Sequence, residues 1–226
     1  ALSRPAQAAL NDASNALEDH QRESGDLQQN VQAAQRNLDQ LDDVRMQKMR
    51  LMNKLNSAAA HLALKIDNDG MANDVIGPLL MEIDVKNVQQ RHLVEQVISV
   101  KILSAFIART DGARDALNQL VSGKQINIYR YKGQAFQPRP RPSSKELKQF
   151  GITAWLDEAL TMKPENRGDV LGVLRDNLNA DLILLGTSKT GDSIEQLQEY
   201  LKSKGMNGAR VITPERIYCL LYTSPS

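Results

Sequence analysis

The chain has 226 residues, which is enough for one or two domains with a hydrophobic core. Its 28 basic and 27 acidic residues almost cancel, so no overall field favours a strongly acidic or basic partner. A single cysteine, Cys219, excludes an intramolecular disulfide, and three scattered histidines give no metal-ligand spacing.

Hydropathy and the two chain ends indicate the class of protein. No apolar run approaches the ~18 residues that a membrane span requires, and no signal peptide is visible. The chain starts at Ala1 and stops in the sequence LLYTSPS. We interpret it as an internal piece of a longer, soluble, intracellular protein that has no membrane partner.

The first 66 residues have the heptad pattern of a coiled coil, because apolar residues recur at alternate steps of three and four. We expect one continuous helix that packs against a partner helix along this seam. Basic and acidic residues cancel here, so this arm should not bind nucleic acid strongly by itself. The main seam residues are Leu10, Leu17, Leu27, Val31, Leu38, Leu41, Met52, Leu55, Leu62 and Ile66.

Beyond a turn-rich stretch, residues 67–78, the apolar pattern shortens to the period of β-strands. The alternation over residues 79–85 predicts a half-buried strand. The following pattern predicts a helix over 88–98, a strand over 102–108, a helix from 111 and a strand over 126–131.

A proline-rich segment separates this region from a second one of similar size. In the second region the pattern predicts a helix over 164–178, a strand ending near 187, a helix over 193–204 and a strand over 210–213. We therefore expect an α+β chain made of a coiled-coil arm and two small mixed α/β subdomains. The expected boundaries are an arm at 1–66, subdomains at 67–131 and 151–222, a basic linker at 132–150 and a tail at 223–226.

The sequence GTSKTGDS, residues 186–193, has the glycine spacing of a phosphate-binding loop that follows a strand. Asp192 replaces the lysine that such a loop needs, and its negative charge opposes phosphate. We interpret the segment as a structural turn that caps the next helix through Asp192 or Ser193. Degenerate phosphate binding and an active nucleotide site are the alternatives.

Other catalytic patterns are missing from the sequence. Asp157 and Glu158 are adjacent carboxylates, but neighbouring side chains point in different directions, so we interpret them as a solvated patch without partners. The sequence also contains neither a nucleophile elbow nor a zinc-protease motif. We therefore expect no enzyme activity and no cofactor in this chain.

The strongest local charge lies at residues 124–148, where seven basic residues and one acidic residue occur together. Five of the nine aromatic residues lie in or just after this segment. Positive charge interleaved with aromatic rings is typical of surfaces that bind phosphates and stack unpaired bases. A basic linker flanked by core aromatics is the alternative. The expected DNA-binding residues, favouring single strands, are Arg130, Lys132, Arg139, Arg141, Lys145 and Lys148.

Five segments in this order resemble the hinge of the structural maintenance of chromosomes (SMC) family, and are most similar to its fifth eukaryotic member. They are IGPLLMEIDVKN, ISVKILSAFIARTDGARDALNQL, SSKELKQFGITAWLDEAL, LGTSKTGDSIEQL and VITPERIY. Together they extend from about residue 74 to 218, with the arm in the expected place before them. The final residues match nothing in the family, and we interpret them as non-native.

This resemblance implies a function in chromosome maintenance. It implies a hinge that pairs with the hinge of the sixth SMC subunit, embraces DNA, and acts in nuclear DNA repair, recombination and chromosome segregation. It also implies that the arm packs against a returning arm of its own chain, and that ATP is bound by a separate head. A nucleotide-dependent enzyme and a coiled-coil scaffold are the alternative functions.

Overall fold

A computed structural model describes the backbone of residues 4–130 and 136–220, and the side chains of these ranges from residue 20 onward. The chain divides into two compact units, Ala1–Lys48 and Met49–Ser226.

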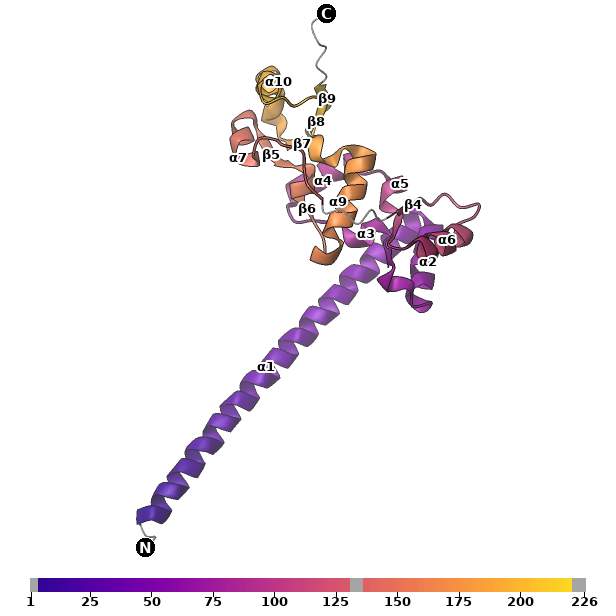
Figure 1. Cartoon of the computed structure of the whole chain (residues 1–226). Helices are drawn as coiled ribbons and strands as arrows, with labels where there is room; N and C mark the ends of the chain where they lie inside the picture. The colour runs from indigo at the N-terminus through magenta and orange to yellow at the C-terminus, as the bar shows by residue number, and fades with distance from the viewer. Residues whose placement is uncertain (1–3, 131–135, 221–226) are drawn as a thin grey trace, which may run out of the picture. The chain divides into compact units, whose positions relative to one another are not determined.

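The first unit consists of helix α1, Arg4–Leu55, which continues into the start of the second unit (Figure 1). Its sequence is rich in Ala, Gln, Leu and Arg, which are strong helix formers. The described side chains from residue 20 to 47 are all exposed. The large apolar residues of the seam are 55–68% exposed, and they are Leu27, Val31, Leu38 and Leu41.

The helix expected to continue to residue 66 is interrupted at Asn56, so that prediction is wrong. Asn56 is extended, with φ −154°, and its side-chain oxygen accepts a hydrogen bond from the N–H of Ala59. The same side chain donates to the carbonyl of Gln125 at 3.2 Å. This N-cap starts a separate helix, α2, Ser57–Asn68.

The second unit contains two strand–helix–strand motifs, each with a parallel strand pair. In the first, β3 and β4 pair in parallel and are joined by α6, while β1 pairs antiparallel with β3. Their bounds are Val75–Ile76 for β1, Phe106–Ala108 for β3, Asp111–Leu120 for α6 and Ile128–Arg130 for β4. Thr110 caps α6 by accepting a hydrogen bond from the N–H of Ala113.

The second motif forms a four-stranded sheet in the order β5-β7-β8-β9. Strands β7 and β8 are parallel and are joined by α10, and the outer strands β5 and β9 are antiparallel to their neighbours. The bounds are Ile152–Trp155 for β5, Ile183–Gly186 for β7, Ile194–Ser203 for α10, Ala209–Ile212 for β8 and Ile217–Leu220 for β9. This is the mixed α/β architecture expected from the sequence.

The two motifs share one hydrophobic core. A two-stranded sheet pairs β2, Asp84–Val85, with β6, Leu160–Thr161, across a long sequence separation. The largest buried cluster combines residues from both motifs, including Ile107 of β3 and Leu185 of β7. Separate clusters lie under α2 and α6 and under α10.

The predicted helices of the second unit are confirmed, with α4 at Val88–Val97 and α9 at Pro164–Leu178. The strand predicted over residues 79–85 is confirmed only at its end, where Asp84–Val85 forms β2. Leu79–Glu82 forms the short helix α3, which buries Leu79, and the buried Ile83 directly follows the helix, four residues after Leu79. An alternating apolar pattern of this length also fits one helical turn.

The strand predicted over 102–108 begins only at Phe106, because Val100–Leu103 forms the helical turn α5. The N–H of Ser104 donates to the carbonyl of Val100 at 2.9 Å and closes this turn. The remaining short elements are η1 at Met71–Asn73, α7 at Ser144–Leu147, η2 at Lys148–Phe150, α8 at Leu156–Ala159, η3 at Ala180–Leu182 and η4 at Ser188–Ser193.

Candidate nucleic-acid interface

The basic segment that sequence analysis assigned to DNA contains a tightly bound strap, residues 138–144. Arg141 in this strap donates from Nη1 to Oδ1 of Asp157 at 2.7 Å and from Nη2 to Oδ2 at 2.9 Å. Its guanidinium also lies 4.6 Å from the centre of the Trp155 ring, and its side chain is 8% exposed. Arg141 is therefore unavailable to a phosphate, which corrects its assignment to the DNA-binding set.

The adjacent carboxylates Asp157 and Glu158 are partners of the strap. Asp157 is buried, and Glu158 accepts hydrogen bonds from Arg141 at 3.2 Å and from the Ser144 hydroxyl at 2.5 Å. The expectation of a solvated patch without partners is wrong, because helix α8 turns both side chains toward the strap.

Arg139 binds the strap to a second buried carboxylate, that of Asp181. Its backbone N–H donates to Asp181 Oδ2 at 3.2 Å, and its Nη1 lies 3.6 Å from Oδ1. Nη2 donates to the side-chain oxygen of Asn179 at 3.1 Å. Its side chain is still 45% exposed, so part of the guanidinium faces solvent.

The other candidate cations lie apart from the strap's ion pairs. Lys145 on α7 and Lys148 on η2 are exposed, three residues apart. Arg130, at the end of β4, is exposed and forms an ion pair with Asp111 at 3.1 Å. Lys132 lies outside the described residues.

The aromatic residues expected to stack on bases are mostly used in the core. Trp155 is fully buried and Phe150 nearly so, and the indole N–H donates to the carbonyl of Pro142 at 3.0 Å. Tyr129 is half-buried against the shared core. Tyr131 lies outside the described residues. These burials remove the reason to expect a preference for single strands.

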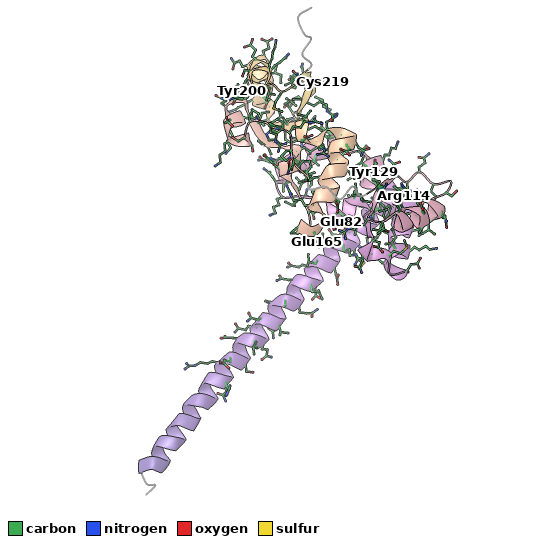
Figure 2. All side chains as sticks on the ribbon, in the orientation of Figure 1. Glu82, Arg114, Tyr129, Glu165, Tyr200 and Cys219 are labelled. Carbon is green, nitrogen blue, oxygen red and sulfur yellow. The ribbon has the colours of Figure 1, made fainter. Side chains whose placement is uncertain are left out.

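Sequence analysis missed one neighbour of the two lysines, the end of helix α10. Tyr200, labelled in Figure 2, packs against Phe150 with ring centres 5.3 Å apart and donates to Glu146 at 3.3 Å. The ammonium of Lys204 lies 5.5 Å from the Tyr200 ring. No local pattern connects residues more than fifty positions apart, so only the fold places Lys204 beside this surface.

The surface also contains one acidic group. The hydroxyl and the backbone N–H of Ser143 donate to Glu146 at 2.7 and 2.8 Å. These hydrogen bonds hold the pKa of Glu146 below its usual value. We name the exposed residues Lys145, Lys148 and Lys204, together with the partly exposed Tyr200 of α10, the lysine face.

The segment that resembles a phosphate loop is folded into the 3-10 helix η4. Thr190 is fully buried, and its hydroxyl accepts a hydrogen bond from the N–H of Thr187 at 3.0 Å. Thr187 and Thr190 form a capping box. Ser193 is the N-cap residue of α10, as predicted, but its side chain forms no capping hydrogen bond and donates instead to the carbonyl of Phe150 at 3.2 Å. A phosphate loop leaves such backbone N–H groups free to bind phosphate, whereas here the N–H of Thr187 is already bonded to Thr190.

A polar network that the sequence does not reveal joins the two halves of the second unit. Arg109, after β3, donates to Asn166 of α9 at 2.7 Å, and Asn166 donates to Glu82 of α3 at 2.7 Å. Arg109 also lies 4.0 Å from Asp169, whose side chain is 9% exposed. Burial raises the pKa of Asp169, and the nearby Arg109 partly offsets this rise.

The seam residues of the arm divide into two groups. Met52, Leu62 and Ile66 are buried inside the second unit, in the cluster that contains Phe106. They pack against helix α6 and β3 of their own domain, in the cluster that also contains Leu117, which corrects their assignment to the coiled coil. Leu55 is 40% exposed. Leu10 and Leu17 lie outside the described side chains.

The described part of the chain contains neither a cluster of metal ligands nor a membrane-spanning helix. Within residues 4–130 and 136–220, no three His, Cys, Asp or Glu side chains gather as metal ligands would. Within the same ranges, each helix is too short or too polar to traverse a bilayer.

The solved structures that resemble this chain include three SMC hinge domains. The S. pombe Smc5/6 hinge domain matches with a TM-score of 0.59 and 17% identity, over 74% of this chain and 62% of that one. The Geobacillus stearothermophilus SMC hinge domain, an asymmetric dimer, matches with a TM-score of 0.49 and 12% identity, over 80% and 71%. The Pyrococcus furiosus Smc hinge domain with an extended coiled coil has a TM-score of 0.47 and 12% identity, over 94% and 74%.

No protein-family model matches the sequence, and no curated protein sequence matches it significantly. The chain spans about 62% of the length of the Smc5/6 hinge structure. An identity of 17% establishes a common fold and nothing finer. The chain has the fold of an SMC hinge domain.

Proposed function

We propose that this chain is the hinge and part of one arm of an SMC subunit, and that it acts as an assembly module rather than an enzyme. The observation that carries the proposal is the fold likeness to the Smc5/6 hinge domain. The exposed apolar seam of α1 supports it, because such a seam is typical of a helix that packs against another. The expected location is the chromosome in the nucleus.

The proposed partner is the hinge of the sixth SMC subunit. Strand edges are the expected contact, because an unpaired edge can add a strand from a second protein. Strand β9 is at one edge of the four-stranded sheet, and Ile217 on it is 51% exposed. The paired hinges would close a complex around DNA in repair, recombination and segregation.

Co-purification tests this pairing. The chain is expressed with the tagged hinge of the sixth subunit, and Ile217→Lys is compared with Val88→Lys, another exposed apolar site, on α4. Recovery of the wild-type chain and of Val88→Lys, with loss of Ile217→Lys, supports pairing through β9. If the wild-type chain does not co-purify, the proposed partner is wrong.

The second part of the proposal is DNA binding by phosphate contacts on the lysine face, with Arg139 and Arg130 as further candidates. All of these side chains are exposed or partly exposed cations. Lys132 stays in the proposed set from its sequence position alone. Contacts to phosphates contribute to DNA binding independently of the base sequence.

The nucleotide-dependent alternative is less favoured. The turn at residues 186–193 uses its own threonines as hydrogen-bond partners, and Asp192 is exposed at the position of the missing lysine. Magnesium-dependent ATP hydrolysis by the purified chain would favour that alternative. A coiled-coil scaffold accounts for α1 but not for the two α/β motifs.

A further inference from the structure

Ser144 lies where the strap meets the carboxylates of α8. Its hydroxyl donates to Oε2 of Glu158 at 2.5 Å, while Oε1 of the same carboxylate accepts from Arg141 at 3.2 Å. Glu158 therefore links Ser144 to the ion pair between Arg141 and Asp157. A charge placed on the Ser144 oxygen would act directly on this cluster.

The cluster is already acidic. Asp157, Glu158 and Asp181 supply three carboxylates, whereas Arg139 and Arg141 supply two guanidinium groups. A phosphoserine adds a charge of about −1.5 to −2 at neutral pH. At Ser144 it would replace a hydrogen-bond donor to Glu158 by a like charge and compete for Arg141.

The sequence before Ser144 has the pattern that basophilic protein kinases read. Arg141 is three residues before it and Arg139 five residues before it, and three prolines keep the stretch extended. Residues 137–140 are exposed and belong to no helix or strand. Ser143, the neighbouring hydroxyl, is instead the N-cap of α7 and forms a capping box with Glu146.

We propose that Ser144 is a phosphorylation site for a basophilic protein kinase and that its modification releases the strap from α8. The kinase transfers the γ-phosphoryl group of ATP to Oγ. The bond from that phosphorus to the oxygen of the β-phosphate breaks, ADP leaves, and the hydroxyl proton passes to the kinase base. This inference rests on the strap and not on the proposed hinge function.

Phosphorylation acts on the open strap. With Arg141 held by Asp157, the kinase cannot read this arginine, so only molecules in which the strap has lifted are substrates. The phosphate then repels Glu158 and disfavours reclosing, which shifts the population toward the open strap. Trp155 reports the change, because Arg141 covers its ring and Pro142 accepts its N–H.

The first test is modification of the purified chain by a kinase that requires arginine at the −3 and −5 positions, with ATP. We expect mass spectrometry to find the phosphate on Ser144, and we expect Ser144→Ala to prevent it. In the modified protein the emission of Trp155, the single tryptophan, should shift to longer wavelength and be quenched more readily by acrylamide. Absence of phosphate at Ser144 overturns the site, and an unchanged Trp155 emission overturns the switch.

The second test compares Ser144→Glu with Ser144→Gln, which differ in charge and hardly in size. Only the glutamate should shift the emission of Trp155 and increase its quenching, while circular dichroism shows equal helix content for both variants. Equal shifts in the two variants would mean that size and not charge disturbs the strap, and this would contradict the proposal. The phosphorylated wild-type chain decides the question independently, because it is modified after folding.

Discussion

Arg141 and Asp157 form a bidentate ion pair, with nitrogen–oxygen distances of 2.7 and 2.9 Å, in which both side chains are almost completely buried. Nη1 of Arg141 also donates to the carbonyl of Asp181 at 3.0 Å. A single guanidinium thus holds a proline-rich strap to helix α8 and to η3. A buried charge is costly when it loses its partner, so the pair should matter more to stability than surface ion pairs do.

Removal of one partner tests this relationship. We expect Arg141→Ala to lower the free energy of unfolding by about 3–5 kcal/mol, because Asp157 would stay buried without its cation. Urea unfolding followed by Trp155 fluorescence measures this loss. The matched control is Arg130→Ala, whose side chain is 60% exposed and whose ion-pair partner, Asp111, is 58% exposed. This control should cost at most about 1 kcal/mol. Equal losses would contradict the special role of Arg141.

The glycine that begins the loop-like turn is required by close packing. A Cβ at Gly186 would lie 2.6 Å from the Thr190 hydroxyl oxygen, which is buried and hydrogen-bonded. We expect Gly186→Ala to destabilise the chain by about 1–3 kcal/mol. At Gly172, inside α9, a Cβ meets no atom within 4 Å. Gly172→Ala should therefore stabilise by about 0.5–1 kcal/mol, and thermal unfolding of the two variants should move in opposite directions. A shift in the same direction would contradict the packing argument.

Local signals explain which elements the sequence predicts. Helices α6 and α9 were predictable because Thr110 caps the first, which also has strong apolar periodicity, and Pro164 opens the second. The pairing of Asp84 with Thr161 joins residues far apart in sequence, so no local pattern reveals it. The same holds for the contact of Tyr200 with Phe150, because Lys204 joins the lysine face only after α10 packs on Phe150.

The sequence predicted which residues of the candidate site are basic, but it did not predict which of them face solvent. The sequence indicates a basic segment, yet a sequence cannot tell a cation that faces solvent from one that is held by a buried carboxylate. Arg141 and Lys145 are four residues apart and have the same sign of charge. The first is bound by Asp157 and the second is exposed, because only the first lies over Trp155.

The lysine face gives a salt-dependent expectation for DNA binding. Removing one cation that binds a phosphate should reduce the slope of log K against log salt by about 0.9 on duplex DNA. Lys145→Ala with Lys148→Ala should thus reduce the slope by about 1.8 in fluorescence anisotropy titrations. The control pair is Lys86→Ala with Lys101→Ala, which removes the same charge from exposed positions elsewhere in the second unit. Equal slopes for the two pairs would assign binding to the net charge and not to this face.

Asp169 gives the chain a defined pH dependence. Its pKa in the folded chain is raised by burial above the ordinary value of 3.8. The unfolded chain loses the Asp169 proton near the ordinary pKa, whereas the folded chain keeps it to a higher pH. As pH rises through this window, the ionisation of Asp169 therefore lowers the free energy of unfolding. Asp169→Asn does not titrate, and it should be more stable than the wild type at neutral pH, with the advantage lost at pH 3. Urea unfolding of both proteins at neutral pH and at pH 3 measures this difference in the free energy of unfolding. An advantage that persists unchanged at pH 3 would exclude this cause.

The exposed seam of α1 leads to an expectation for the complete subunit. Leu27, Val31, Leu38 and Leu41 lie along one seam and are more than half exposed, which is costly for a helix in water. In the proposed hinge the chain folds back, so these residues should face a returning helix of the same chain. A cysteine at Leu38 should then form a disulfide with a cysteine on the returning helix, in a background where Cys219 is replaced by serine.

Position 43 supplies the control for this cross-link, because Asp43 falls on the opposite side of the heptad from the seam. Cysteine there should form no disulfide with the returning helix under the same oxidation. The two possible cross-linked products differ in mass on a non-reducing gel. A disulfide within one chain leaves a monomer, and a disulfide between two copies gives a dimer. A dimer linked through Leu38→Cys in the complete subunit would contradict the folded-back arm. It would favour a parallel scaffold of two α1 helices, because only that arrangement brings the same seam position of two copies together.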